Sequence, residues 1–75
     1  MIKKFESEMS IQIKLATNLR RKRKSMKLTQ EEFASLCGLH RTYIGAIERG
    51  ERNITLSTLE SIADAIKVQA HELIK

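Results

Sequence analysis

The sequence predicts an all-α domain of five helices. The chain has 75 residues with no proline and only three glycines, and it is rich in residues that favour helices. Two capping boxes mark helix starts within it, one at Thr29 with Glu32 and one at Ser57 with Glu60. A chain this short buries only about 60% of its unfolded surface, so association with a second copy would help its stability. We expect a lead-in over residues 1–9 and one domain over residues 10–75.

The first helix is expected from about residue 10 to residue 26. The run Arg-Arg-Lys-Arg-Lys at residues 20–24 crowds its C-terminal end, where cations suit the negative end of the helix dipole. We expect these side chains either to form a solvated face or, for some of them, to contact phosphate groups. Ile13 lies off the inward-facing stripe. That stripe falls at helical spacing and consists of Ile11, Leu15, Ala16, Leu19 and Met26.

The second and third helices are expected within residues 29–48, joined by a tight turn. Thr29 can cap the first of them, and Gly38 can take the positive φ that ends it. The next helix begins near residues 40–41 and carries polar donors at its front. A helix, a glycine turn and a helix with polar donors form the helix-turn-helix pattern of major-groove readers. The inward-facing residues are Phe33, Ala34, Leu36 and Cys37, then Ile44 and Ile47.

Two more helices are expected after the loop at residues 51–56. Ser57 is favoured as the N-cap of a helix that runs to about Ile66, and Val68 lies in the next connection. The last short helix is expected over residues 70–74. The inner face of the longer helix consists of Leu59, Ile62, Ala63 and Ile66.

The charge is unevenly distributed. The net charge is +5; residues 1–30 hold nine Lys and Arg against two Glu, whereas residues 31–75 hold five against seven Asp and Glu. A pI near 9.7 suits a nucleic-acid binder, and an aromatic content of 4% is too low for a single-strand stacking surface. We expect neither a signal peptide nor a membrane span, because no apolar run approaches the roughly 18 residues that a span requires. We expect a cytoplasmic protein of a prokaryotic cell, associated with the nucleoid and not with a membrane.

Enzymatic chemistry is not expected. The sequence offers no Ser/His/Asp set, no paired acids and no glycine-rich phosphate loop. His40 and His71 have no Cys/His neighbours at ligand spacing, so we expect neither a metal nor a cofactor. The single Cys37 is expected to be a small core residue.

Three segments resemble a known family. These are Leu-Thr-Gln-Glu-Glu-Phe-Ala at residues 28–34, Arg-Thr-Tyr-Ile at residues 41–44 and Ile-Glu-Arg-Gly-Glu-Arg-Asn-Ile-Thr at residues 47–55. With Leu59 and residues 62–66, they resemble the phage-repressor-like (Xre-type) helix-turn-helix proteins, and most of all the controller proteins of restriction–modification systems. The resemblance covers residues 11–74 and implies a phage-repressor-like fold.

The sequence departs from this family at two turns. Lys27 stands where the family often has Gly, so it must adopt a left-handed conformation or end the helix differently. His40 stands at an N-cap position more often held by Ser, Asp or Asn, where it can cap the helix or touch a phosphate.

The resemblance, with the chemistry of each side chain, implies a DNA-binding surface. Arg41 can donate two hydrogen bonds to a guanine edge. Gln30 either clamps a phosphate or caps its helix, and Tyr43 either reaches DNA or is a boundary residue. The full set of expected DNA contacts is Gln30, Arg41, Thr42, Tyr43, Ala46, Arg49, Arg52, Asn53, Thr55 and Thr58.

Two further contacts are expected. In the family, an Arg near the end of the first helix pairs with a Glu at the end of the recognition helix, and Arg23 and Glu48 match these positions. The resemblance therefore implies a buried or half-buried ion pair that fixes the helix orientation. The dimer surface is expected on the last two helices, through Ile66, Val68, Leu73 and Ile74.

The function expected is that of a homodimeric, sequence-specific transcription regulator of double-stranded DNA. In a controller, the resemblance implies an operator near the promoters of its own gene and of the endonuclease, with both activation and repression. Activation requires a surface for RNA polymerase, for which Glu31 and Glu32 are candidates. The alternatives are a general Xre-type repressor and an antitoxin-like protein-interaction module.

Overall fold

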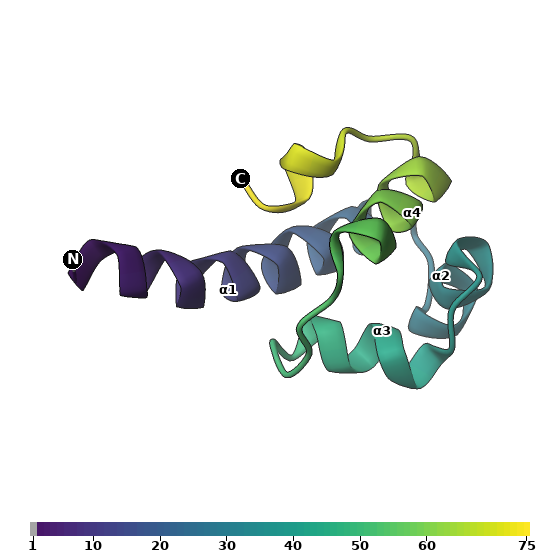
Figure 1. Ribbon diagram of the computed structural model, residues 1–75. Helices are drawn as coiled ribbons and strands as arrows, with labels where there is room; N and C mark the ends of the chain where they lie inside the picture. The colour runs from purple at the N-terminus through teal and green to yellow at the C-terminus, as the bar shows by residue number, and fades with distance from the viewer. Residues whose placement is uncertain (1) are drawn as a thin grey trace.

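Residues 2–75 form four α-helices and one short 3-10 helix (Figure 1). The computed structural model describes the backbone of residues 2–75 and the side chains of residues 11–75. The elements are α1 (Ile2–Ser25), α2 (Gln30–Cys37), α3 (Arg41–Glu48), α4 (Leu56–Ile66) and the 3-10 turn η1 (Ala70–Leu73). The predicted all-α class is confirmed, and no strand occurs in residues 2–75. The predicted last short helix is present, but as a 3-10 helix, so the count of five α-helices is not confirmed: N–H groups bond three residues back, from Glu72 to Gln69 and from Ile74 to His71.

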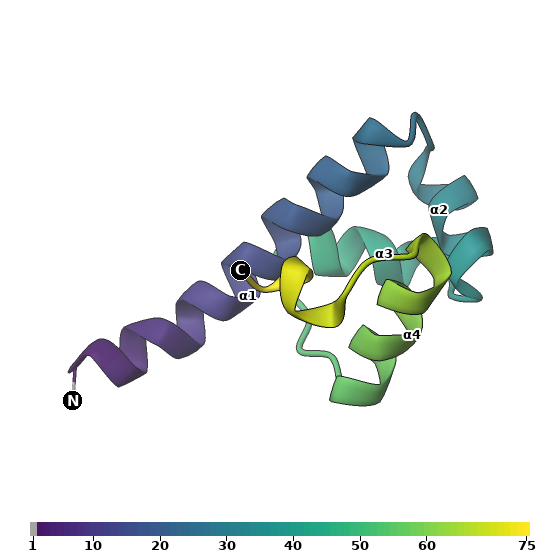
Figure 2. The ribbon, with the colours of Figure 1, turned by 90° about the horizontal axis from the view of Figure 1, so that it is seen from above.

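The first helix is longer than predicted. It begins at Ile2 rather than near residue 10, because residues 2–9 contain no Pro or Gly to stop it. The lead-in predicted over residues 1–9 is therefore, from Ile2 on, the first part of α1, while Met1 lies outside the described residues. The other elements gather around the C-terminal half of α1 (Figure 2). No helix of residues 2–75 is both long and apolar enough to cross a lipid bilayer.

The hydrophobic core joins all four helices. Its fully buried side chains are Leu19, Phe33, Ile44, Ile47 and Ile62. Cys37 packs against this core, and burial raises the pKa of its thiol, as suits a packing residue.

Two predicted core positions are exposed. Leu36 lies roughly 110° around α2 from the centre of the face that buries Phe33 and Ala34, so its side chain faces solvent. Ile11 is 44% exposed because it lies one turn before Leu15, at the edge of the packed body.

Local hydrogen bonds begin the three shorter helices. The capping box of α2 is confirmed: Glu32 N–H donates to Thr29 Oγ1 over 3.1 Å, and Thr29 N–H donates to Glu32 Oε1 over 2.8 Å. Gly38 ends α2 at φ 70°. His40 caps α3, its Nδ1 accepting the Thr42 N–H over 3.2 Å.

The second predicted capping box is wrong. Thr55, not Ser57, is the N-cap of α4, and its Oγ1 accepts the Thr58 N–H over 3.1 Å. Both hydroxyls could cap, and capping at Thr55 gives a helix two residues longer with more backbone hydrogen bonds.

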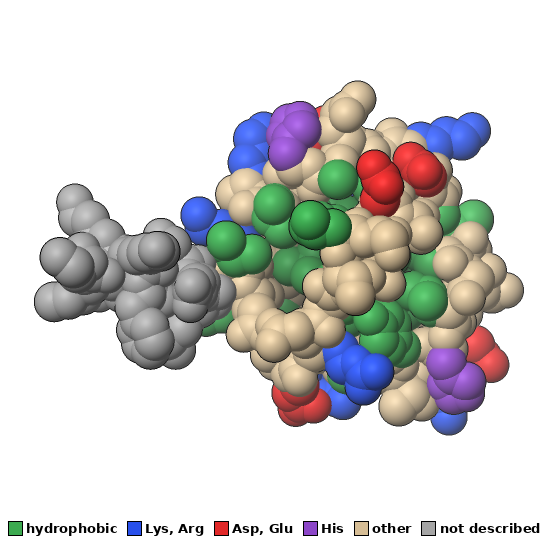
Figure 3. Space-filling model, in the orientation of Figure 1, with side chains coloured by type: hydrophobic (Ala, Val, Ile, Leu, Met, Phe, Trp, Pro, Cys, Tyr) green, Lys and Arg blue, Asp and Glu red, His purple; other side chains and the backbone are tan. Residues whose placement is uncertain are grey.

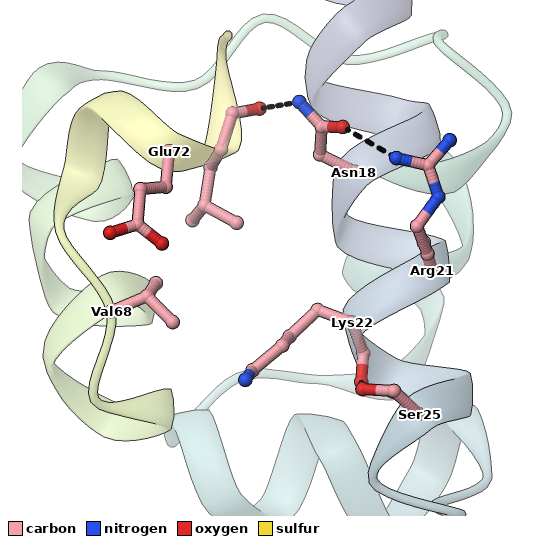
Figure 4. Close-up of a pocket in the computed structure, with 7 residues that line it drawn as sticks. Asn18, Arg21, Lys22, Ser25, Val68 and Glu72 are labelled. Atoms are coloured by element: carbon pink, nitrogen blue, oxygen red, sulfur yellow. Dashed lines mark hydrogen bonds between the residues drawn. The ribbon is translucent and has the colours of Figure 1, made fainter.

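The C-terminal segment is attached to α1. Asn18 Nδ2 donates to the Leu73 carbonyl over 3.1 Å, across a hollow of about 280 Å³ lined by Arg21, Lys22, Val68 and Glu72 among others (Figure 4). This contact holds η1 against the C-terminal half of α1.

Two lysines hold left-handed backbone conformations. Lys27 at the end of α1 has φ 60° and Lys67 at the end of α4 has φ 61°. A side chain at such a φ costs about 1 kcal/mol that glycine avoids.

We therefore expect Lys27→Gly to raise the free energy of unfolding by about 0.5–1 kcal/mol in urea denaturation. The control is Lys24→Gly, which removes the same charge inside α1 and should lower the free energy of unfolding. A lower free energy of unfolding in both variants would contradict the prediction.

Candidate nucleic-acid interface

A buried ion pair joins α1 to the end of α3. Arg23 Nε donates to Glu48 Oε2 over 2.7 Å, and Arg23 Nη2 donates to Glu48 Oε1 over 3.0 Å. The two side chains are 11% and 4% exposed. This is the pairing expected from the sequence, and its two parallel hydrogen bonds fix both partners.

The same two side chains hold two further segments. Arg23 Nη1 donates to the Leu28 carbonyl over 2.8 Å, in the connection between α1 and α2. Gln30 Nε2, at the first residue of α2, donates to Glu48 Oε1 over 3.0 Å. One ion pair therefore links three helices at the base of the predicted recognition helix.

The charge of Glu48 is kept by these bonds. Burial alone would raise the pKa of the Glu48 carboxyl, but the hydrogen bonds from Arg23 and Gln30 outweigh burial and lower the pKa below its usual value. The bond to Glu48 likewise raises the pKa of Arg23. Both groups stay ionised at neutral pH.

A polar hollow opens beside this ion pair. It has a volume of about 210 Å³ and is lined by Gln30, Arg41, Thr42, Gly45 and Arg49. Four of these five residues were predicted DNA contacts, and the fold brings them together across the start of α2 and one face of α3. Arg41 and Thr42 are exposed at the front of α3. The hollow therefore presents guanidinium, amide and hydroxyl groups on one surface.

Gly45 also lines this hollow, although it was not among the predicted DNA contacts. A methyl group at Gly45 would lie 3.2 Å from Arg49 Nη1 and 3.4 Å from Gln30 Oε1. The missing side chain thus lets these two polar groups lie over the backbone of α3. The sequence signal was present, because a glycine inside a helix costs about 1 kcal/mol relative to alanine and calls for a local reason.

Two arginines after α3 contact neighbouring side chains. The guanidinium carbon of Arg52 lies 4.7 Å from the centre of the Tyr43 ring, which is a cation–π geometry. Arg49 Nε lies 3.1 Å from Glu51 Oε2 in an exposed ion pair. Such an exposed pair contributes little stability, so Arg49 is available to another anion. The lower edge of Figure 3, where α3 runs in Figure 1, carries Arg and Lys side chains together with Asp or Glu and His side chains.

The remaining predicted contacts have other partners or partial exposure. Asn53 Oδ1 accepts a hydrogen bond from Gln12 of α1, a contact that the sequence did not suggest. Thr55 and Thr58 are hydrogen-bonded to each other within the cap of α4. Ala46 is half-buried. Among the described residues, no three His, Cys, Asp or Glu side chains form a group that could hold a metal ion.

The family model described as Helix-turn-helix (HTH_3) matches the sequence over residues 19–73. The chain belongs to the helix-turn-helix family. The match includes α2, α3 and α4 and both members of the ion pair.

Comparison with individual proteins shows which members of the family the chain resembles. The chain is 48% identical over 66 residues to the control protein C.SmaI of Serratia marcescens, covering 88% of this chain and 79% of that protein. Its fold is similar to that of the restriction–modification controller protein C.AhdI from Aeromonas hydrophila, with a TM-score of 0.77, 39% identity, and coverage of 83% and 94% of the two chains. It is also similar to the hypothetical transcription factor NHTF from Neisseria, with a TM-score of 0.82, 43% identity, and coverage of 87% and 75%. The predicted resemblance to controller proteins is confirmed.

The ion pair generates a pH-dependent prediction. Glu48→Gln should lower the free energy of unfolding at pH 7 by about 3 kcal/mol, because it leaves the Arg23 charge buried without its counter-ion. The folded pKa of Glu48 is lowered, so its stabilisation is complete above the unfolded pKa of about 4.3 and is lost as the pH falls through the folded value. The gap between wild type and variant should therefore close below about pH 4 in urea titrations.

Two controls separate the ion pair from general effects. Glu60→Gln removes an exposed carboxylate of α4 and should leave stability at pH 7 nearly unchanged. The double variant Arg23→Met/Glu48→Leu should recover most of the loss, because an apolar pair of similar volume leaves no buried charge. An equal gap at pH 3 and pH 7 would show that the Glu48 charge is not responsible.

Proposed function

We propose that this protein is a sequence-specific transcription regulator of double-stranded DNA, of the controller type found in restriction–modification systems. The observation that carries the proposal is the polar surface of α3, held by the Arg23–Glu48 ion pair. The relatives named as controller proteins support the restriction–modification context. In this role the protein acts on chromosomal DNA in the cytoplasm, without enzymatic activity and without a cofactor.

In the proposed complex, the N-terminal half of α3 enters a major groove. Arg41 supplies a planar pair of donors that suits guanine O6 and N7, and Thr42 offers a hydroxyl or a methyl to a neighbouring base. The Gln30 and Arg49 side chains both lie beside Gly45, and in this complex their donors reach the flanking phosphates. Arg52 and Asn53 extend the contact along the backbone from the loop after α3.

Two copies of the chain bind together in this proposal. Two-fold related copies place their α3 helices in successive major grooves, about 34 Å apart, on half-sites of an inverted repeat. Binding near its own promoter and that of an endonuclease lets occupancy determine activation or repression. Glu31 is the better candidate for an RNA polymerase contact, because Glu32 is hydrogen-bonded within the α2 cap.

Footprinting on the DNA upstream of its own gene tests the proposal. We expect two protected half-sites, each about one helical turn from the other, with an affinity that falls steeply as salt rises. Selection from a random duplex library gives the operator independently. Protection without any sequence preference would contradict the proposal.

Arg41→Ala should relax sequence discrimination. The difference in binding free energy between the operator and a duplex with the contacted guanine replaced should shrink by about 1–3 kcal/mol, measured by fluorescence anisotropy at fixed salt. The charge-matched control is Arg21→Ala, on the hollow between α1 and η1, which should keep that difference. If Arg41→Ala weakens both duplexes equally, Arg41 contacts a phosphate instead.

Gly45→Ala should make the protein more stable and weaken its binding to DNA. The added methyl meets only the terminal groups of the Gln30 and Arg49 side chains, which need to shift by a few tenths of an ångström. Alanine favours the helix, so the free energy of unfolding should rise by up to about 1 kcal/mol. Operator affinity should fall, because both polar side chains must move away from the surface of α3. Ser35→Ala, at an exposed position of α2 outside the hollow, is the control for helix propensity and should leave operator affinity unchanged. Unchanged operator affinity in Gly45→Ala would show that the hollow is not used.

A further inference from the structure

An exposed carboxylate lies just after α3, beside an arginine of the proposed DNA surface. Glu51 Oε2 lies 3.1 Å from Arg49 Nε, and the two side chains are 59% and 58% exposed. The other acidic residue between residues 41 and 58 is Glu48, whose charge is buried against Arg23. Glu51 is therefore the carboxylate of this stretch that a DNA phosphate would meet.

The turn that ends α3 fixes the position of Glu51. The Glu51 N–H donates to the Ala46 carbonyl over 3.0 Å, and the Gly50 N–H donates to the Ile47 carbonyl over 2.9 Å. These two bonds, with Gly50 at φ 72°, form a Schellman motif, in which glycine supplies the left-handed residue. The backbone of residue 51 is thus held against the end of α3, within reach of Arg49.

Glu51 is poorly placed to stabilise the fold. A carboxylate beyond the last turn of a helix lies at the negative end of the helix dipole, which disfavours an anion. The ion pair with Arg49 is more than half exposed on both sides, and such pairs contribute little to stability. The charge of Glu51 therefore acts mainly on whatever else approaches Arg49.

The Arg49 side chain also reaches the polar hollow of α3. Its Nη1 would lie 3.2 Å from a methyl group at Gly45, and it lines the hollow together with Gln30, Arg41 and Thr42. The described residues that line this hollow include no acid. The guanidinium of Arg49 thus lies between a surface of donors, where a phosphate would bind, and one carboxylate.

We propose that Glu51 weakens the contact between Arg49 and the DNA backbone, and so lowers the affinity for DNA of any sequence. The Glu51 carboxylate and a phosphate are two anions for the same guanidinium. Binding must therefore either break the Arg49–Glu51 pair or bring the two anions close together, and both reduce the net electrostatic gain. The inference rests on the proposed DNA-binding function and names the residue that limits its phosphate contact.

The weaker phosphate contact gives base recognition a larger share of the binding energy. Phosphate contacts add similar affinity to every duplex, whereas base contacts add affinity to the operator. Arg41 and Arg49 stand at opposite ends of α3, about 12 Å apart along its axis. That separation exceeds the Debye length of about 8 Å at physiological salt, so the Glu51 charge acts on Arg49 far more than on Arg41.

Glu51→Gln tests the proposal through affinity and its dependence on salt. On a duplex with one half-site, fluorescence anisotropy at low salt should show binding about two- to fivefold tighter than wild type. The plot of log K against log salt should be steeper by up to about 0.9. In wild type, Glu51 takes up a cation when Arg49 leaves it, which cancels part of the counter-ion release. A duplex without the half-site should gain the same factor, so the ratio of the two affinities should not change.

Two further variants separate the ion pair from net charge. Glu72→Gln removes an exposed carboxylate of η1, on the side of the molecule away from α3 (Figures 1 and 2), and should leave affinity and slope nearly unchanged. Arg49→Gln should weaken binding to both duplexes, and adding Glu51→Gln to it should have no further effect. An equal gain with and without Arg49 would overturn the proposal in favour of general repulsion. Weaker binding by Glu51→Gln would overturn it by showing that Glu51 positions Arg49 for DNA.

The same titrations distinguish failure of this inference from failure of the proposed function. If wild type shows no preference for the half-site, the proposed sequence-specific function fails. If wild type prefers the half-site and Glu51→Gln binds with unchanged affinity and slope, the role of Glu51 is overturned and the proposed function stands. Circular dichroism should show the same thermal unfolding for wild type and Glu51→Gln, because the exposed pair contributes little stability.

Discussion

The orientation of α3 depends on one buried ion pair. An eight-residue helix is too short to be stable alone, so its direction is set by what it touches. Its apolar side contributes Ile44 and Ile47 to the core, but apolar contacts permit sliding and rotation. The two-point bond from Arg23 to Glu48, fixed in turn by Gln30 and the Leu28 carbonyl, removes that freedom. The exposed face that remains is the one carrying Arg41 and Thr42.

The ion pair explains how the carboxylate of Glu48 can lie on a helix whose exposed face would contact DNA. Glu48 ends the helix that would face a polyanion, where an exposed carboxylate would be repelled. Its charge is instead compensated by Arg23 and its oxygens are occupied by three hydrogen bonds. Arg23 is likewise removed from the surface, although it lies within the basic run at residues 20–24. A run of cations in the sequence is therefore not a uniform cationic face.

Local chemistry explains which features the sequence predicted. Caps that depend on a few neighbouring residues, such as the Thr29–Glu32 box and Gly38, were predictable and are present. The choice between Thr55 and Ser57 as N-cap was not, because both hydroxyls can cap and the packing of α4 decides the register. The ion pair was reached through the resemblance, since nothing local links residues 25 positions apart. The exposure of Ile11 depends on where the packed body ends, which periodicity alone does not contain, whereas the exposure of Leu36 follows from its angular position on α2.

The loop after α3 connects the reading surface to two other helices. Within four residues, Arg52 covers Tyr43 of α3, Asn53 is bonded to Gln12 of α1, and Thr55 caps α4. Contacts with three helices therefore set the path of this loop, so its position relative to α3 does not depend on the loop residues alone. DNA bound along Arg52 and Asn53 would meet groups that the fold already holds beside α3.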